Sequence, residues 1–467
     1  MTTHAAPEAD WGALLRDGRG GMVAVLCMAI WLHAADSLIA ATTLPRAVQE
    51  IGGAQYVSWA FMLYELGTIL AGAATGLYVA RLGLRRAFAL AALIYAGGCA
   101  VSALAPLMAV LLAGRLGQGV GGGWLLALTY VAMNRLFPER LVPKLLALIA
   151  TVWSVSAFCG PLIGGTFANF GLWRFAFWAF AAQAGLFLIA VLLIVAKEDR
   201  EEAAAPGSVP VRRLALLGGS VLATALAGAY AHIILSPVLC LAGLFLFLAF
   251  LRMDRASGPT RMFPRRMFDI GRAMGAGMGM VLAASVATTS FVIYGPLLLG
   301  ELFGMRPLIA GVLVAVEAVS WGVTAVLFAN ADKATEPWLI RGGALAIALG
   351  GIGFALAMPA GPLAAIWVCA ALQGGGFGMM WGFAVQRIIA AAPQADREIA
   401  SYAVPTIQQI GYALGAALSG LVANFAGFSG GVTLAAAQDV AFWVFAAFAP
   451  LLVFAVFAAN RLARSSS

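Results

Sequence analysis

Long apolar stretches separated by short polar segments recur along the whole of this sequence. A helix rises 1.5 Å per residue, so about 20 apolar residues are needed to cross the ~30 Å hydrocarbon core of a bilayer. Only 10% of the residues are charged, whereas soluble globular proteins carry about 25%. We therefore expect an all-α, multi-pass membrane protein whose main partner is the lipid bilayer.

The apolar stretches predict fourteen membrane-spanning helices. Each is long enough to cross the hydrocarbon core as a helix. The expected spans are residues 21–44, 55–80, 86–105, 107–134, 144–168, 175–196, 213–231, 233–251, 273–299, 308–329, 338–358, 361–387, 401–425 and 438–460.

The basic residues predict the orientation, because lysine and arginine concentrate in cytoplasmic loops. With a cytoplasmic N-terminus, nearly all of the 28 basic residues fall on the cytoplasmic side. The outer loops hold only Arg46, Arg174 and Arg306, and Arg115 lies within a span. We expect both termini in the cytoplasm, and we attribute the net charge of +8 to topology rather than to nucleic acid as a partner.

Two polar segments divide the chain, and the two short spans between them resemble an inserted transmembrane hairpin. Without that hairpin the chain reads as six spans plus six. We expect a cytoplasmic segment 1–20, a six-helix bundle 21–196, a linker 197–212, the hairpin 213–251, a linker 252–272, a second six-helix bundle 273–460 and a cytoplasmic tail 461–467.

The fourth span of each six carries a glutamine, then a glycine cluster, then a tryptophan. In the first this run extends from Gln118 to Trp124, and in the second from Gln373 to Trp381. The match indicates an internal repeat. Chance is the alternative, because the chain contains 55 glycines.

Four charged side chains fall well inside expected spans, at Asp36, Glu65, Arg115 and Glu317. A charge near mid-membrane costs ~2.5–3.5 kcal/mol or more, so it needs a partner or water. Counting from the ends of the spans places all four at a similar depth. A common polar cavity explains that agreement, and structural pairs that lock helices together are the alternative.

Helical spacing adds amides and aromatic rings to these charges. A cavity with such a lining suits an amphipathic organic molecule, cationic or zwitterionic. The candidate substrate-binding residues are His33, Gln118, Trp153, Trp321, Gln373, Gln408, Gln409 and Tyr412. Of these, His33 has the weakest support, because a lone histidine on an apolar helix face usually makes its hydrogen bonds within the core and binds no ligand.

The same charges are the candidate proton-coupling residues. Burial favours the neutral form of a carboxyl group, and a nearby arginine favours the ionised form. We hypothesise that Asp36, tuned by Arg115, loads and releases a proton. In this hypothesis Glu65 or Glu317 binds a cationic substrate or shares the proton.

Several motifs resemble the major facilitator superfamily, in particular its fourteen-helix drug:proton antiporter branch. Gly76–Arg86 is similar to the signature of the loop between helices 2 and 3, with Ala80 where the family has aspartate. Arg115–Gly123 resembles the helix 4 signature Arg-x-x-Gln-Gly-x-Gly, and Gly160–Gly165 resembles the Gly-Pro-x-x-Gly-Gly of the helix 5 antiporter signature.

The resemblance implies two pseudo-symmetric six-helix bundles around a central cavity, alternating access and proton-driven export. It also implies structural or gating roles for residues in two of the motifs. These are Gly76, Arg81, Gly83, Arg85, Arg86, Gly160, Pro161, Gly164 and Gly165.

The favoured function is therefore a proton-coupled exporter of amphipathic drugs or toxic metabolites, monomeric and in a bacterial inner membrane. A dedicated transporter of one metabolite, such as a siderophore or another secreted product, is the alternative. A membrane protein without transport activity is a weaker one. An enzyme is disfavoured, because the short loops offer no catalytic cluster. The five cysteines and three histidines are scattered, so we expect no metal site and no cofactor, only a proton gradient as energy source.

Overall fold

The computed structural model describes residues 11–16, 18–196, 210–230, 232–329, 331–428 and 434–464. The predicted segment 1–20, linker 197–212 and tail 461–467 lie partly or mostly outside these ranges. The described residues form fourteen α-helices and a few short 3-10 turns. The helices are α1 (Arg19–Ile51), α2 (Val57–Ala103), α3 (Met108–Leu136), α4 (Val142–Asn169), α5 (Trp173–Ile194), α6 (Val211–Tyr230), α7 (Leu235–Ala256), α8 (Ala273–Phe303), α9 (Pro307–Leu327), α10 (Glu336–Ala360), α11 (Leu363–Ala390), α12 (Arg397–Phe425), α13 (Leu434–Ala446) and α14 (Ala449–Arg464).

Twelve helical stretches in the described part of the chain are long and apolar enough to cross a membrane. The prediction of an all-α, multi-pass membrane protein is thus confirmed. The expected spans 107–134 and 401–425 form α3 and α12, which are not among the twelve. The count of fourteen spans therefore stays a prediction.

Three expected spans differ from the helices that the structure contains. The spans 55–80 and 86–105 are joined in α2, which breaks at Gly83 with φ 72° and ψ 164°. Glycine adopts this backbone conformation without the steric cost that a side chain would add. The last expected span, 438–460, is divided into α13 and α14.

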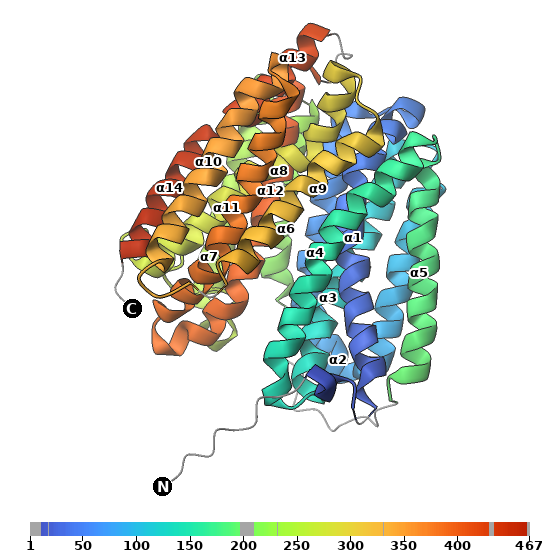
Figure 1. Cartoon of the computed structure of the whole chain (residues 1–467), viewed down its shortest axis with the longest axis vertical. Helices are drawn as coiled ribbons and strands as arrows, with labels where there is room; N and C mark the ends of the chain where they lie inside the picture. The colour runs from blue at the N-terminus through green and yellow to red at the C-terminus, as the bar shows by residue number, and fades with distance from the viewer. Residues whose placement is uncertain are drawn as a thin grey trace.

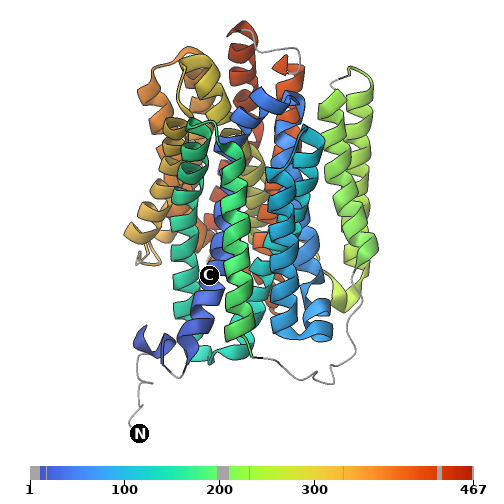
Figure 2. The ribbon, with the colours of Figure 1, turned by 90° about the vertical axis from the view of Figure 1, so that its right-hand side faces the viewer.

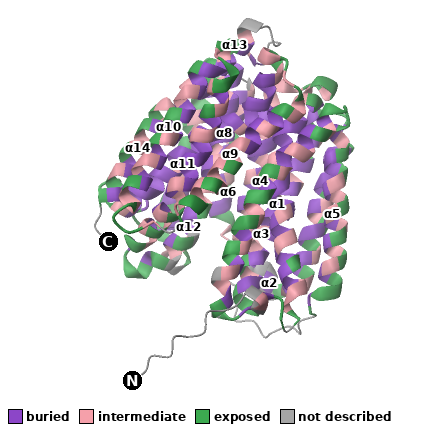
Figure 3. Cartoon of the chain, viewed as in Figure 1, coloured by how far each residue is buried: buried purple, intermediate pink, exposed green. Residues whose placement is uncertain are grey.

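The helices form two bundles, α1–α5 and α8–α14 (Figure 1). The pair α6 and α7 lies at the edge of the molecule (Figure 2). The bundles approach each other at the end that holds the α1–α2 connection, Gly52–Tyr56, and diverge toward the end where α1 begins. We call the first the convergent end. Buried residues are concentrated in the middle of the bundles, and α8 is buried along most of its length (Figure 3).

Glycines on α3 let its backbone approach α2 closely. A methyl group on Gly119 would collide with the carbonyl oxygen of Tyr64, and one on Gly123 would collide with Thr68. Small residues at helix interfaces permit such close packing in membranes. The glycine cluster therefore forms a seam rather than a weak point in the helix.

The second bundle repeats this seam between α11 and α9. A methyl group on Gly374 would collide with the carbonyl oxygen of Glu317, and one on Gly378 would collide with that of Trp321. Gln118 and Gln373 each precede the first glycine of these pairs. The two glutamine–glycine runs thus occupy equivalent places in the two bundles.

At the convergent end the two bundles pack on each other through α4 and α9. A methyl group on Gly165 would lie 3.0 Å from the Cα atom of Leu308, and one on Gly311 would lie 2.6 Å from the Pro161 carbonyl oxygen. This seam holds the bundles together at one end, so separating them there breaks backbone packing.

The α3 seam predicts a stability difference between two glycines. Gly119→Ala should destabilise the protein by about 1–3 kcal/mol, because the added methyl group overpacks a backbone contact. The control is Gly97→Ala, where an added methyl group would meet nothing within 4 Å. Removing a helical glycine there should be neutral or stabilise by about 0.5–1 kcal/mol. Unfolding midpoints of both purified variants in detergent test this. Equal midpoints would contradict the seam.

Candidate functional site

An ion pair between α3 and α1 forms the centre of the site. Nη1 of Arg115 lies 3.3 Å from Oδ1 of Asp36, and both side chains are 0% exposed. The same nitrogen donates to the Asp36 carbonyl oxygen at 3.4 Å. An isolated charge in such a place would be strongly disfavoured, so each group depends on the other.

The rest of the guanidinium group contacts α2. Nε of Arg115 donates to the Ala60 carbonyl oxygen at 3.3 Å. The guanidinium carbon lies 4.3 Å from the centre of the Tyr64 ring, a cation–π distance. Arg115 therefore fastens α1 and α2 to α3.

The Gln118 side chain is held by hydrogen bonds at both ends. Its Nε2 donates to Oδ1 of Asp36 and to Sγ of Cys99, each at 3.2 Å. Its Oε1 accepts from the Ser102 hydroxyl at 3.1 Å and from Nη1 of Arg115 at 3.3 Å. These bonds fix the amide and, through it, the orientation of the carboxylate.

Tyr64 connects this pair to His33. The Tyr64 hydroxyl donates to the His33 carbonyl oxygen at 2.8 Å and lies 3.1 Å from the ring nitrogen Nδ1. The two rings stack with 5.6 Å between their centres, and Trp153 packs edge-on against His33 at the same distance. The histidine thus belongs to the packed interior of the first bundle.

Two carboxylate oxygens in this region accept no hydrogen bond from the described residues. They are Oδ2 of Asp36 and Oε2 of Glu65, both buried. The Tyr95 hydroxyl lies near Asp36 and donates to the Leu32 carbonyl oxygen at 3.0 Å. A carboxylate oxygen with an open position can take up a proton without breaking an existing bond.

The second bundle contains a smaller polar cluster. Nε2 of Gln373 donates to Oε1 of Glu317 at 2.9 Å. The Trp321 ring, one turn further along α9, stacks on Phe377 at 4.9 Å and meets Trp381 at 6.1 Å. The cluster thus joins one carboxylate to a group of aromatic rings.

Helix α12 adds amides and a phenol between the two bundles. Nε2 of Gln408 donates to the Tyr412 hydroxyl at 3.0 Å, and Oε1 of Gln409 is buried without a hydrogen-bond partner among the described residues. Glu65 and Glu317 both act electrostatically on Tyr412. Tyr412 is therefore in the field of one carboxylate from each bundle.

The four intramembrane charges differ in burial, and the expectation that they line one cavity stays a prediction. Asp36, Arg115 and Gln118 are fully buried inside the first bundle, where α3 packs closely against α2. His33 and Gln373 are also buried, at 1% exposure. The other candidate proton-coupling and substrate-binding residues are partly exposed. They are Glu65, Trp153, Glu317, Trp321, Gln408, Gln409 and Tyr412.

The motif Gly160–Gly165, which resembles the helix 5 signature, lies on α4, because two expected spans are joined in α2. It packs against both α1 and α9. A methyl group on Gly160 would lie 2.6 Å from the Ala35 carbonyl oxygen, and one on Gly164 would collide with Thr42, both on α1. The Thr42 hydroxyl donates to the Pro161 carbonyl oxygen at 3.1 Å. The motif thus packs against α1, while Gly165 packs against the other bundle.

The structure describes the surroundings of only some residues of the predicted gating motif Gly76–Arg86. Gly83 breaks α2, and Nη2 of Arg85 donates to the Leu192 carbonyl oxygen near the end of α5, at 2.5 Å. Arg81 and Arg86 are exposed. The helix continues through residue 76, whose surroundings are not among those described, so the gating role of the motif stays a prediction.

Sequence reasoning missed Tyr64, Cys99 and Ser102. Tyr64 directly precedes Glu65, and Cys99 and Ser102 are three residues apart on one helix face. The sequence contains these spacings, but it does not show that the three residues surround Arg115 and Gln118. That contact arises because α2 turns back at Gly83 and packs both of its halves against α3.

Comparisons with known proteins agree with this geometry. The sequence profile of the Major Facilitator Superfamily matches residues 26–416. A probable multidrug-efflux transporter of Mycobacterium tuberculosis is 30% identical over 96% of both chains. A bacterial homologue of the human lysosomal transporter Spinster, solved in an inward-facing conformation, superposes with a TM-score of 0.66 at 14% identity, covering 96% of this chain and 97% of its own. A peptide transporter solved with alafosfalin gives a TM-score of 0.69 at 14% identity, covering 98% and 97%.

The buried ion pair predicts strong coupling between its two members. Arg115→Met should destabilise the protein by about 3–5 kcal/mol, because it leaves the Asp36 carboxylate buried without its cation. Adding Asp36→Leu should recover much of that loss, because the double variant buries no charge. Denaturant-induced unfolding of the single and double variants in detergent measures the coupling. Losses that simply add would show that the pair is not coupled.

Proposed function

This chain belongs to the Major Facilitator Superfamily, and we propose that it is a proton-coupled exporter of amphipathic, cationic or zwitterionic drugs or toxic metabolites. It is a secondary transporter related to probable multidrug-efflux transporters. Proton coupling, substrate class and direction are the proposal.

The observation that carries the proposal is the buried Asp36–Arg115 pair with its open carboxylate oxygen. Protonation of Asp36 removes the negative member of the pair and weakens its hold on Arg115. Because Arg115 fastens α1 and α2 to α3, this local change in charge alters the packing of three helices. Local electrostatic changes of this kind can bias an element that has two arrangements.

The substrate side of the proposal uses the partly exposed residues between the bundles. A cation there can be attracted by Glu65 and Glu317 and can stack on aromatic faces such as Trp321. Glu65 belongs to the first bundle and Glu317 to the second, so a substrate held by both carboxylates would contact both bundles at once. Contact with both bundles lets substrate occupancy bias their relative position.

We propose that the export cycle rocks one bundle against the other. Alternating access in such folds is largely a rigid-body motion of two repeats around a fixed site. The Gly165–Leu308 packing at the convergent end would have to separate in the opposite conformation. In this cycle Gly160 and Gly164 would stay packed on α1, which is a structural role. Gly165 would lose and regain its contact with α9, which is a gating role.

The topology in this proposal has fourteen spans, both termini in the cytoplasm and the convergent end facing outward. The basic residues support it, since nearly all of them lie on one side. We place the protein as a monomer in a bacterial inner membrane. The proposal uses the boundaries of the two bundles, the linkers and the hairpin that the sequence predicts.

Liposomes containing the purified protein test the coupling directly. With an acidic lumen, wild-type protein should accumulate an external cationic dye such as ethidium, and without a gradient it should not. Asp36→Asn should lower the gradient-driven rate by more than about tenfold, a barrier change above about 1.4 kcal/mol. Because Asp36→Asn leaves the Arg115 cation buried without its anion, it should also lower the unfolding midpoint in detergent, so uptake is compared only for protein that elutes as folded material.

The matched control is Asp439→Asn, which removes an exposed carboxylate from α13 and should leave uptake unchanged. Gradient-driven uptake that persists in Asp36→Asn would sink the coupling role. A lack of response to any cationic dye would favour the dedicated metabolite transporter.

Glu317→Gln should weaken binding of a cationic dye about tenfold, or about 1.4 kcal/mol, while a neutral amphipathic dye binds as before. The reason is that the change removes one charge but keeps the shape of the side chain. Glu301→Gln, at an exposed position on α8, is the control. Equal losses for both dyes would assign Glu317 a structural role instead. Equilibrium binding measured by fluorescence distinguishes these outcomes.

A further inference from the structure

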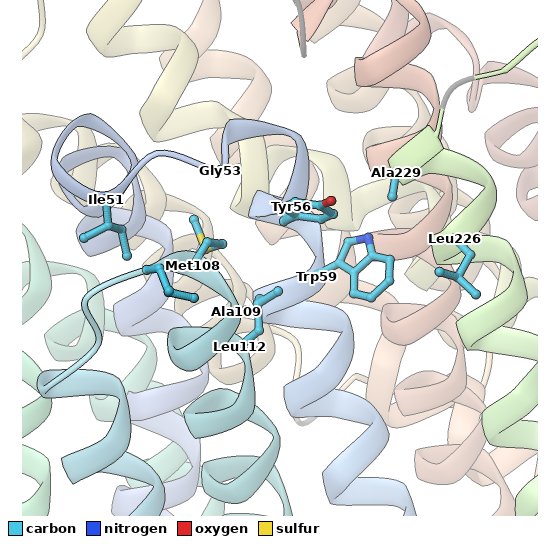
Figure 4. A pocket seen from close by; sticks show the side chains of 10 residues that line it. Ile51, Gly53, Tyr56, Trp59, Met108, Ala109, Leu112, Leu226 and Ala229 are labelled. Atoms are coloured by element: carbon cyan, nitrogen blue, oxygen red, sulfur yellow. The ribbon is translucent and has the colours of Figure 1, made fainter.

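A cavity of about 460 Å³ lies at the convergent end, between the first bundle and α6 (Figure 4). Its size falls in the range of small-molecule sites, roughly 300–1,000 Å³. The polar clusters described above contribute no residue to its lining. The lining residues are Ile51, Gly53, Tyr56, Trp59, Leu107, Met108, Ala109, Leu112, Leu226 and Ala229.

The walls of the cavity belong to two differently anchored parts of the molecule. Leu226 and Ala229 come from α6, which is fastened to the second bundle. Nδ2 of Asn424 on α12 donates to the Gly228 carbonyl oxygen at 3.0 Å and also to the Gln55 carbonyl oxygen of the α1–α2 connection at 3.0 Å. A methyl group on Gly228 would lie 2.7 Å from the backbone nitrogen of Leu421. The remaining lining residues belong to the first bundle or its loops.

The other end of the α6–α7 pair is also fastened to the second bundle. Arg213 on α6 pairs with Asp254 on α7 at 2.7 Å, and Asp254 accepts the backbone N–H groups of Met262 and Phe263. Arg261, in the segment that follows α7, forms an ion pair with Asp396 at the start of α12. Toward the first bundle, by contrast, α6 makes the apolar contact of Gly218 with Leu66.

The chemistry of the lining favours a hydrocarbon. It contains no charged side chain, so a cation would find no partner in it. Tyr56 and Trp59 extend from the first bundle toward α6, as Figure 4 shows. Tyrosine and tryptophan gather at membrane interfaces, and these two lie at the end of a candidate span, Ala54–Thr75.

The rim of the cavity is continuous with exposed apolar surface. Leu107 is 49% exposed, and Leu222, one turn before Leu226 on α6, is 38% exposed. In a membrane these side chains face lipid. Phospholipid chains are therefore the molecules that reach this rim at the highest concentration.

We propose that the cavity holds a hydrocarbon chain of a membrane phospholipid, which fills the space between α6 and the first bundle. A bound chain completes the apolar packing there without fixing the two parts to each other. Since α6 moves with the second bundle, the site changes shape when the bundles rock. The bound lipid chain thus keeps the space between α6 and the first bundle filled as the site changes shape. Its site is separate from the substrate site.

A phospholipid with a diazirine in its acyl chain tests the proposal in liposomes containing the full-length protein. After illumination, mass spectrometry should find the label on lining residues such as Met108 and Leu226 several-fold above Leu241, an exposed residue of α7. Ala229→Trp, which fills the cavity, should abolish this excess. Ala215→Trp, at an exposed position near the other end of α6, should keep it.

Equal labelling of the lining and of Leu241 would overturn the proposal, as would an excess that survives Ala229→Trp. Displacement of the label by a transported cationic dye would also overturn it, because the cavity would then belong to the substrate pathway. If Ala229→Trp shifts the unfolding midpoint, Ala109→Trp fills the cavity from α3 and serves as the second variant.

Discussion

The structure depends on one buried interaction, the ion pair between Arg115 and Asp36. Two charges removed from water are tolerated only when geometry and hydrogen bonds compensate for their lost hydration. Here the compensation comes from the Ala60 carbonyl oxygen, the Tyr64 ring and the Gln118 amide. These groups come from α2 and α3, and Asp36 belongs to α1, so the charge pair also sets how those three helices pack. A proton that arrives at Asp36 therefore changes packing as well as charge.

The glycine seams make this arrangement possible. Because Gly119 and Gly123 carry no side chain, α3 lies directly against the backbone of α2, and the Arg115 guanidinium reaches Tyr64 and Ala60. The second bundle has the same construction, with Gly374 against Glu317. There the place of Tyr64 is taken by a carboxylate, and the aromatic contact comes from Trp321 and its neighbours. One backbone design thus supports an ion pair in one bundle and a carboxylate beside aromatic rings in the other.

The α6–α7 pair shows how an added element can be joined to a two-bundle protein without preventing motion between the bundles. Polar contacts at both of its ends fasten it to the second bundle, through Asn424 and through Asp396. Its other side meets the first bundle across an apolar cavity. Polar and ionic contacts fix geometry, whereas apolar contacts allow surfaces to slide with little loss. The asymmetry of these contacts assigns the pair to the second bundle.

The sequence by itself determined the membrane-spanning character, most helix positions, the similarity of the two glutamine–glycine runs and the fact that the charges of Asp36 and Arg115 need partners. These follow from hydropathy, helical period and the cost of a charge in lipid, which are local properties. Only the tertiary structure decided that Asp36, Arg115 and Gln118 lie in a sealed interior and that Tyr64, Cys99 and Ser102 complete their surroundings. Burial and hydrogen bonding depend on which helices meet, and residues from Asp36 to Gln118 are brought together only when α2 turns back at Gly83.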